Sequence, residues 1–94
     1  MNSVRLALTT LVVPDYDAGI AFFVDTLGFD LIEDSDMGGG KRWVVVGGKD
    51  GGRLLLAQAA NDAQAAAIGN QTGGRVGFFL NTDDFRRDHA AMVA

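Results

Sequence analysis

The chain has 94 residues, of which 48% are hydrophobic and 21% charged, as is typical of one globular domain and not of a disordered chain. The formal net charge is −4 and no run of lysine or arginine occurs, which argues against nucleic acid and anionic membrane surfaces as partners. Because the chain has no cysteine, disulfides, thiolate catalysis and thiolate metal sites are excluded.

The N-terminal residues predict a strand. Residues 4–13 are rich in aliphatic and β-branched side chains, and Pro14 ends the run because proline cannot donate a hydrogen bond to a sheet. Residues 1–13 alternate in polarity and lack a small-residue cleavage site, so we expect this strand and not a signal peptide. No apolar run approaches the roughly 20 residues that a membrane helix needs. We therefore expect a cytoplasmic protein with no membrane partner.

An amphipathic helix is predicted directly after this strand. Asp15 or Asp17 is a candidate N-cap, because a carboxylate accepts hydrogen bonds from the first free N–H groups of a helix. Apolar residues then recur at helical spacing from Ala18 to Leu27. Gly28 is placed to end the helix as its C-cap glycine.

Three strands joined by glycine-rich turns follow the helix. The strands are expected at residues 29–33, 41–46 and 53–58, with turns at 34–40 and 47–52. Glycine favours such turns because it tolerates positive φ. Strands joined by short turns pair antiparallel, so we expect antiparallel neighbours here.

The second part of the chain begins like the first. After a short surface helix from about residue 61 to 68, residues 75–80 predict another strand. Asp83 or Asp84 then caps a helix that reaches Met92. An acidic cap followed by an aromatic residue thus recurs after about 69 residues, which indicates a weak internal repeat.

These elements predict an α+β fold in a single domain of residues 1–94. Residues 1–58 are expected to form a β-α-β-β-β module, residues 59–74 a linker, and residues 75–94 the β-α start of a second module. A domain of this size buries only a modest core, so we expect it to rely on a partner subunit.

The segment from Leu11 to Phe29 resembles the opening of the vicinal oxygen chelate superfamily, which contains glyoxalases, bleomycin resistance proteins and extradiol dioxygenases. The apolar strand, the acidic cap, Ala-Phe-Phe at residues 21–23 and Leu-Gly-Phe at 27–29 carry the resemblance. It implies a glyoxalase/bleomycin-resistance/dihydroxybiphenyl dioxygenase-like fold, in which two modules enclose a cavity for a small-molecule ligand. The last three strands of the second module are absent here, so we expect a second copy to cover the open sheet edge in a homodimer.

The resemblance also implies where a metal ion would be bound. Metal-dependent members place His or Gln in the first strand, Glu in the last strand of the first module and His at the start of the second. These positions fall on Leu8, Leu55 and Arg75, and leucine has no donor atom while arginine stays cationic. We therefore expect no metal site and no cofactor. The single histidine, His89, is expected on the solvated surface of the last helix.

Charged and aromatic residues near the expected cavity are ligand-binding candidates. Arg75 is expected either to bind an anionic ligand or to form an ion pair with Asp83. Arg42 and Trp43 point to opposite faces of one strand, so only one of them faces the cavity. Trp43 either stacks on a flat ligand or belongs to the core.

Amide and apolar groups complete the candidate set. The side chains of Gln58, Asn70 and Gln71 lie near the junction of the modules and either contact a ligand or are solvated. Thr10 shares the face of Leu8, which makes the first-strand contribution to the cavity mostly apolar. The ligand-binding candidates are Arg75, Trp43, Arg42, Thr10, Gln58 and Phe79, and no catalytic residue is assigned.

Three functions are compatible with these residues. The first is binding of a small molecule without a metal site, as in the bleomycin-resistance branch. The second is a metal-dependent enzyme, similar to lactoylglutathione lyase or to a dioxygenase, which needs a divalent metal ion and takes its ligands from other residues. The third is an assembly subunit without a ligand. One scaffold hosts many activities, so the fold does not choose among them.

Overall fold

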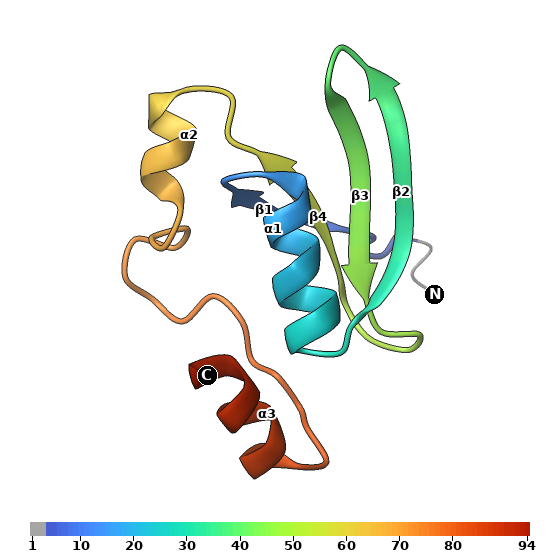
Figure 1. Ribbon diagram of the computed structural model, residues 1–94, viewed down its shortest axis with the longest axis vertical. Coiled ribbons are helices and arrows are strands. Elements are labelled where there is room, and N and C mark those ends of the chain that lie inside the picture. Colours follow the sequence, from blue (N-terminus) through green and yellow to red (C-terminus); the bar gives the residue numbers. More distant parts are fainter. Residues whose placement is uncertain (1–3) are drawn as a thin grey trace.

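A four-stranded sheet in the order β1-β4-β3-β2 forms the centre of the part of the chain that is described (Figure 1). In the computed structural model, which describes residues 4–94, β1 (Thr9–Val13) pairs in parallel with β4 (Arg53–Gln58). Strand β3 (Lys41–Gly47) pairs antiparallel with β4 and with β2 (Asp30–Gly38). The α+β fold and the antiparallel pairing of the three later strands are therefore confirmed.

Strands β1 and β2 differ by several residues from their predicted bounds, and β3 is one residue longer than predicted. Residues 4–8 of the predicted 4–13 strand precede β1 without regular secondary structure, and residues 1–3 lie outside the described residues. Strand β2 continues to Gly38, so part of the predicted 34–40 turn is strand. The glycines at its end predicted a turn, and the turn is limited to those glycines, which have positive φ. The acidic residues before them are accommodated because β2 is an edge strand, where charged side chains reach solvent.

The strand predicted at residues 75–80 is not formed. This stretch has no regular secondary structure and lies in the long connection between α2 and α3 (Figure 1). A strand needs a neighbour to satisfy its backbone N–H and C=O groups. The strands among the described residues pair only with one another, so this apolar segment has no partner there.

The first helix follows its predicted limits closely. It comprises α1 (Tyr16–Ile20) and a π-helical continuation, η1 (Ala21–Thr26). Asp15 is the N-cap, because its Oδ1 accepts a hydrogen bond of 2.7 Å from the backbone N–H of Ala18. Gly28, with φ of 82°, ends the helix in the left-handed conformation that glycine adopts without strain.

Two further helices follow the sheet. Helix α2 (Asp62–Ala67) is capped by Asn61, and α3 (Phe85–Val93) is capped by Asp84. The Asp84 carboxylate accepts from a backbone N–H three residues later at 3.0 Å, as Asp15 does at the start of α1. The two capped helices therefore repeat one local design. No helix among the described residues is long and apolar enough to cross a membrane.

The hydrophobic core lies between the first helix and one face of the sheet (Figure 1). Gly19 of α1 lies in this contact, because a Cβ at that position would be 2.9 Å from Cδ1 of Leu56. A glycine there allows the helix to approach the sheet closely. The buried core residues are Val13, Tyr16, Phe23, Val44, Val46 and Leu56.

Candidate functional site

An apolar pocket of about 790 Å³ lies between the first module and the segment that leads into α3. Its wall comes from residues 6–9, from the first half of η1 and the loop into β2, from the turn between β3 and β4 with the start of β4, and from residues 77–81 with Met92 of α3. Among the described residues that line it, only Asp30 and Arg53 are charged. A volume of this size is typical of ligand pockets. Its aromatic lining consists of Phe22, Phe23, Phe29, Phe78 and Phe79.

Much of this wall is open to solvent. Leu6 is 85% exposed and Phe79 is 89% exposed, although both are large apolar side chains. Contiguous apolar surface of this kind marks a binding site or an interface. Sequence analysis identified Phe79 but missed Leu6 and Phe22, because an apolar residue in a strand or helix pattern is normally assigned to the core.

Thr10 and Trp43 lie on the face of the sheet opposite to the first helix. Thr10 pairs with Leu55, which precedes the core residue Leu56, and Trp43 directly precedes the core residue Val44. Successive residues of a strand point to opposite faces, so both side chains point away from the core. Trp43 is half-buried and does not belong to the core cluster. The structure therefore places these two candidates on one surface, outside the apolar pocket.

Arg42 points toward the helix and ties it to the sheet. Its guanidinium donates to both carboxylate oxygens of Asp34, at 3.1 and 2.7 Å, and to Asp17 at 2.9 Å. It also lies 5.2 Å from the ring centre of Tyr16. Hydrogen bonding to Arg42 lowers the pKa of Asp34. Arg42 thus joins Asp17 of α1 to Asp34 of β2, and a role of Arg42 in ligand binding stays a prediction. Gln58, on the same face and exposed at the end of β4, lines no part of the apolar pocket.

Arg75 does not occupy the predicted position at the start of a strand. It is exposed in a turn, where its backbone carbonyl accepts a hydrogen bond from the hydroxyl of Thr72. The alternative ion pair with Asp83 is also absent, because Asp83 pairs with Arg87 at 2.9 Å. The predicted ion pair of Arg75 with Asp83 is therefore wrong, since the strand that would have oriented its side chain is not formed. Binding of an anionic ligand by Arg75 stays a prediction.

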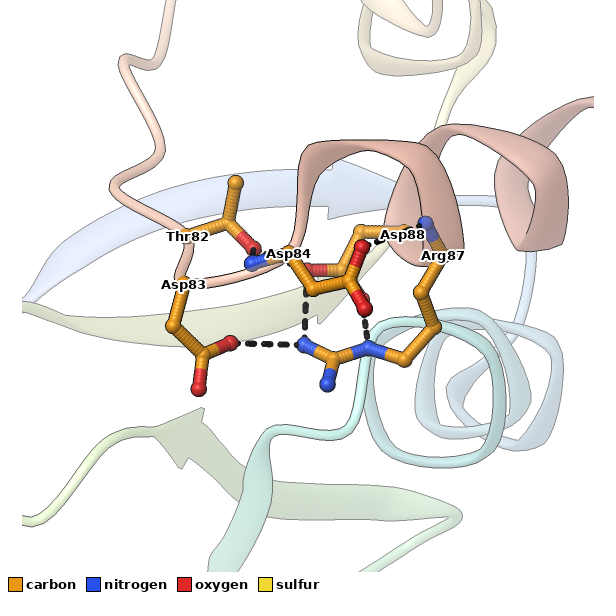
Figure 2. A network of polar contacts seen from close by, with 5 residues as sticks. All are labelled: Thr82, Asp83, Asp84, Arg87 and Asp88. Carbon is orange, nitrogen blue, oxygen red and sulfur yellow. Dashed lines mark hydrogen bonds and ion pairs between the residues drawn. The ribbon is translucent and has the colours of Figure 1, made fainter.

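A polar network fixes the start of α3 (Figure 2). Arg87 Nε donates to Asp88 at 2.9 Å, and the hydroxyl of Thr82 donates to the other oxygen of the same carboxylate. The pKa of Asp88 is lowered mainly by the hydrogen bonds from Arg87 and next by the hydrogen bond from Thr82. The network joins residues 82–88 to one another, so it stabilises the start of α3 locally. Met92, near the other end of this helix, lines the apolar pocket.

Gln71 makes a contact that sequence analysis did not foresee. Its side chain forms two hydrogen bonds with the backbone of Val12 in β1, so it is not merely solvated. The two residues are 59 positions apart, and a glutamine in a linker carries no periodic signal that predicts such a contact. Asn70, its neighbour, is exposed.

The residues at the three expected metal-binding positions do not fit a divalent metal ion. Leu8 lines the apolar pocket with hydrocarbon, Leu55 lies in β4 and Arg75 is an exposed cation. Within residues 4–94, no group of three or more His, Asp or Glu side chains is placed to hold a metal ion. His89 is exposed on α3 and stacks on Phe85, with ring centres 5.4 Å apart.

Comparison with known sequences identifies a family and a relative. The family model described as Glyoxalase/Bleomycin resistance protein/Dioxygenase superfamily matches residues 5–94. An uncharacterized protein from Shewanella frigidimarina (strain NCIMB 400) is 56% identical over 85 residues. The match covers 87% of this chain but 63% of that relative, so the chain spans less than two thirds of the relative's length.

Solved structures share the fold. The crystal structure of UcmS2 aligns over 96% of this chain and 76% of its own, with a TM-score of 0.72 and 25% identity. A glyoxalase/bleomycin resistance protein from Streptomyces sp. CB03234 aligns over 95% of this chain and 72% of its own, with a TM-score of 0.63 and 29% identity. TnmS3, an antibiotic binding protein from the same organism, aligns over 99% of this chain and 71% of its own, with a TM-score of 0.63 and 29% identity.

Proposed function

This chain belongs to the glyoxalase/bleomycin resistance protein/dioxygenase superfamily, and from that premise we propose that it binds a small organic molecule in its apolar pocket. The observation that carries the proposal is the lining, in which phenylalanine and aliphatic side chains border an open pocket of about 790 Å³. Among the described lining residues only Asp30 and Arg53 are charged. The similarity to TnmS3, described as an antibiotic binding protein, supports binding as a use of this fold.

We propose further that binding needs no metal ion held at the family's ligand positions. Leu8, at the first of these positions, contributes hydrocarbon to the wall of the pocket. Leu55 and Arg75, at the other two, supply no lone pair for a cation. The expected ligand is therefore held by apolar contact with the pocket and not by chelation.

Fluorescence titration tests the binding site directly. N-phenyl-1-naphthylamine, a neutral aromatic dye that brightens in apolar surroundings, is the probe. Phe79→Ala is expected to raise the dissociation constant of the dye by about 3- to 10-fold, which is the effect of losing one aromatic contact. Phe85→Ala is a matched control, because Phe85 is also exposed, at 68%, but does not line the pocket. Equal effects of the two substitutions, or no binding to the unmodified protein, would contradict the proposal.

Elemental analysis tests the metal-independent part. Protein purified without chelator is expected to contain far less than one divalent metal ion per chain, and dye binding is expected to survive EDTA. About one tightly bound metal ion per chain would instead favour the metal-dependent lyase or dioxygenase.

We also propose a homodimer, in which a second copy covers part of the exposed apolar surface. Leu6, Phe78 and Phe79 supply such surface at 85%, 42% and 89% exposure. Sedimentation equilibrium checks this, because a particle of twice the 9.9 kDa chain mass supports the dimer and a 9.9 kDa particle contradicts it. The cytoplasmic location expected from the sequence stays a prediction.

A further inference from the structure

The side chain of Gln71 pairs with the edge of β1 as a neighbouring strand would. The backbone N–H of Val12 donates to Gln71 Oε1 at 3.3 Å, and Gln71 Nε2 donates to the carbonyl of Val12 at 2.7 Å. One residue further along, the carbonyl of Val13 accepts from Ala59 on the other side of the strand. Because backbone groups alternate in direction along a strand, Val12 presents both of its groups to the free edge of the sheet.

This contact leads directly to the wall of the apolar pocket. The hydroxyl of Thr72, the next residue, donates to the carbonyl of Arg75 and closes a tight turn. The methyl group of Thr72 lies 3.3 Å from the position that a Cβ would take at Gly77. Gly77 is the first residue of the 77–81 segment that lines the pocket. A short, internally bonded turn therefore connects the edge of β1 to this wall.

We propose that Gln71 is a positioning residue that fixes the 77–81 wall of the pocket against the first module. The role rests on the proposed function of that pocket, and it requires a side chain that donates and accepts at once. Because 77–81 has no strand partner among the described residues, its position depends on anchors outside its own backbone. A primary amide with the reach of glutamine meets both groups of Val12, whereas a carboxylate accepts but cannot donate.

Three variants separate hydrogen bonding from side-chain volume. Gln71→Ala removes both hydrogen bonds, and Gln71→Met removes them while keeping a side chain of similar length. Gln71→Glu at neutral pH keeps an acceptor for the Val12 N–H but loses the donor to its carbonyl. Asn70→Ala is the control, because this neighbouring exposed amide makes no side-chain hydrogen bond within the described residues.

The first measurement is hydrogen exchange of the Val12 amide by NMR. Gln71→Ala and Gln71→Met are expected to exchange about 5- to 10-fold faster than the unmodified protein, which corresponds to the loss of one hydrogen bond. The exchange rate in Gln71→Glu should lie between the rates in these two variants and the rate in the unmodified protein. Asn70→Ala should leave the exchange rate unchanged. An unchanged Val12 rate in both Gln71→Ala and Gln71→Met would overturn the proposal.

The second measurement is the dissociation constant of N-phenyl-1-naphthylamine in the same variants. The dissociation constant is expected to be lowest for the unmodified protein, higher for Gln71→Glu, and highest for Gln71→Met and Gln71→Ala. The lowest and highest values should differ by about threefold or more. Faster Val12 exchange with unchanged dye affinity would overturn the positioning role. If the unmodified protein does not bind the dye, the proposed function fails, but the positioning role can still be tested by 15N relaxation of the Phe78 and Phe79 backbone amides. Increased motion of these amides in Gln71→Ala supports the positioning role, and unchanged relaxation rejects it.

Discussion

Replacing Gly19 by alanine tests how closely the first helix packs on the sheet. The added methyl carbon would lie 2.9 Å from Cδ1 of Leu56 and 3.3 Å from Cγ1 of Val13. Leu56 is 1% exposed and Val13 is 6% exposed, so neither side chain has free space to move into. The helix or the sheet must shift to accept the methyl group.

Two opposing effects decide the change in the free energy of unfolding. Alanine is favoured over glycine in a helix by about 0.5–1 kcal/mol, which would stabilise the protein. An extra methyl group in a close-packed core costs roughly 1–3 kcal/mol. We therefore expect Gly19→Ala to lower the free energy of unfolding by about 1 kcal/mol, against the direction that helix propensity alone predicts.

Urea unfolding followed by circular dichroism measures this change. Ala18→Gly, at the exposed neighbouring position of α1, isolates the propensity effect without a packing effect. Combining Gly19→Ala with Leu56→Ala should be less destabilising than the sum of the two, because the new methyl partly fills the space that Leu56 leaves. If Gly19→Ala stabilises the protein by about as much as Ala18→Gly destabilises it, the close contact does not exist.

Other predictions concern the caps and the link between helix and sheet. Asp15→Ala should lower the free energy of global unfolding by about 1 kcal/mol in urea titrations. Asp84→Ala should instead accelerate hydrogen exchange only in the exposed α3. A lower free energy of global unfolding in Asp84→Ala would show that α3 unfolds together with the core. Arg42→Gln should raise the pKa of Asp34, followed by the NMR shift of its carboxyl carbon, because the hydrogen bond from Arg42 is the main cause of its lowered pKa. A carboxylate whose pKa is lowered in the folded state stabilises the protein above its unfolded-state pKa, and this stability is lost as the pH falls through the folded-state pKa. Arg42→Gln should therefore lose less stability in acid than the unmodified protein. An unchanged Asp34 pKa in the variant would refute the ion pair.

Elements carried by local patterns were predictable from sequence. The spacing of apolar residues and the flanking Asp15 and Gly28 give the first helix nearly its observed limits. Glycine-rich turns between aliphatic runs likewise predict the antiparallel strands. In each case the cause lies within a few residues of the effect, because caps and turns are short-range interactions.

The candidate site was predictable only in part. Alternation shows that Arg42 and Trp43 face opposite ways, but only the packed structure shows that Arg42 meets Asp34 on the helix side. Phe79, a ligand-binding candidate from the sequence, lines the apolar pocket, and Leu6 joins it from the other end of the chain. Ligand binding by Phe79 stays a prediction. A pocket wall is assembled from segments far apart in sequence, so periodicity within one segment does not reveal its neighbours.

The amino-acid sequence by itself determined the helix, the strands of the first module, the family resemblance and the lack of donor atoms at Leu8 and Leu55. Tertiary structure alone decided that residues 75–80 have no strand partner in the described part of the chain and that Gln71 binds the edge of β1. The physical reason is the range of the interactions. Caps, turns and amphipathic faces are encoded locally, whereas a strand and a side-chain contact across 59 positions exist only when a distant partner is in place.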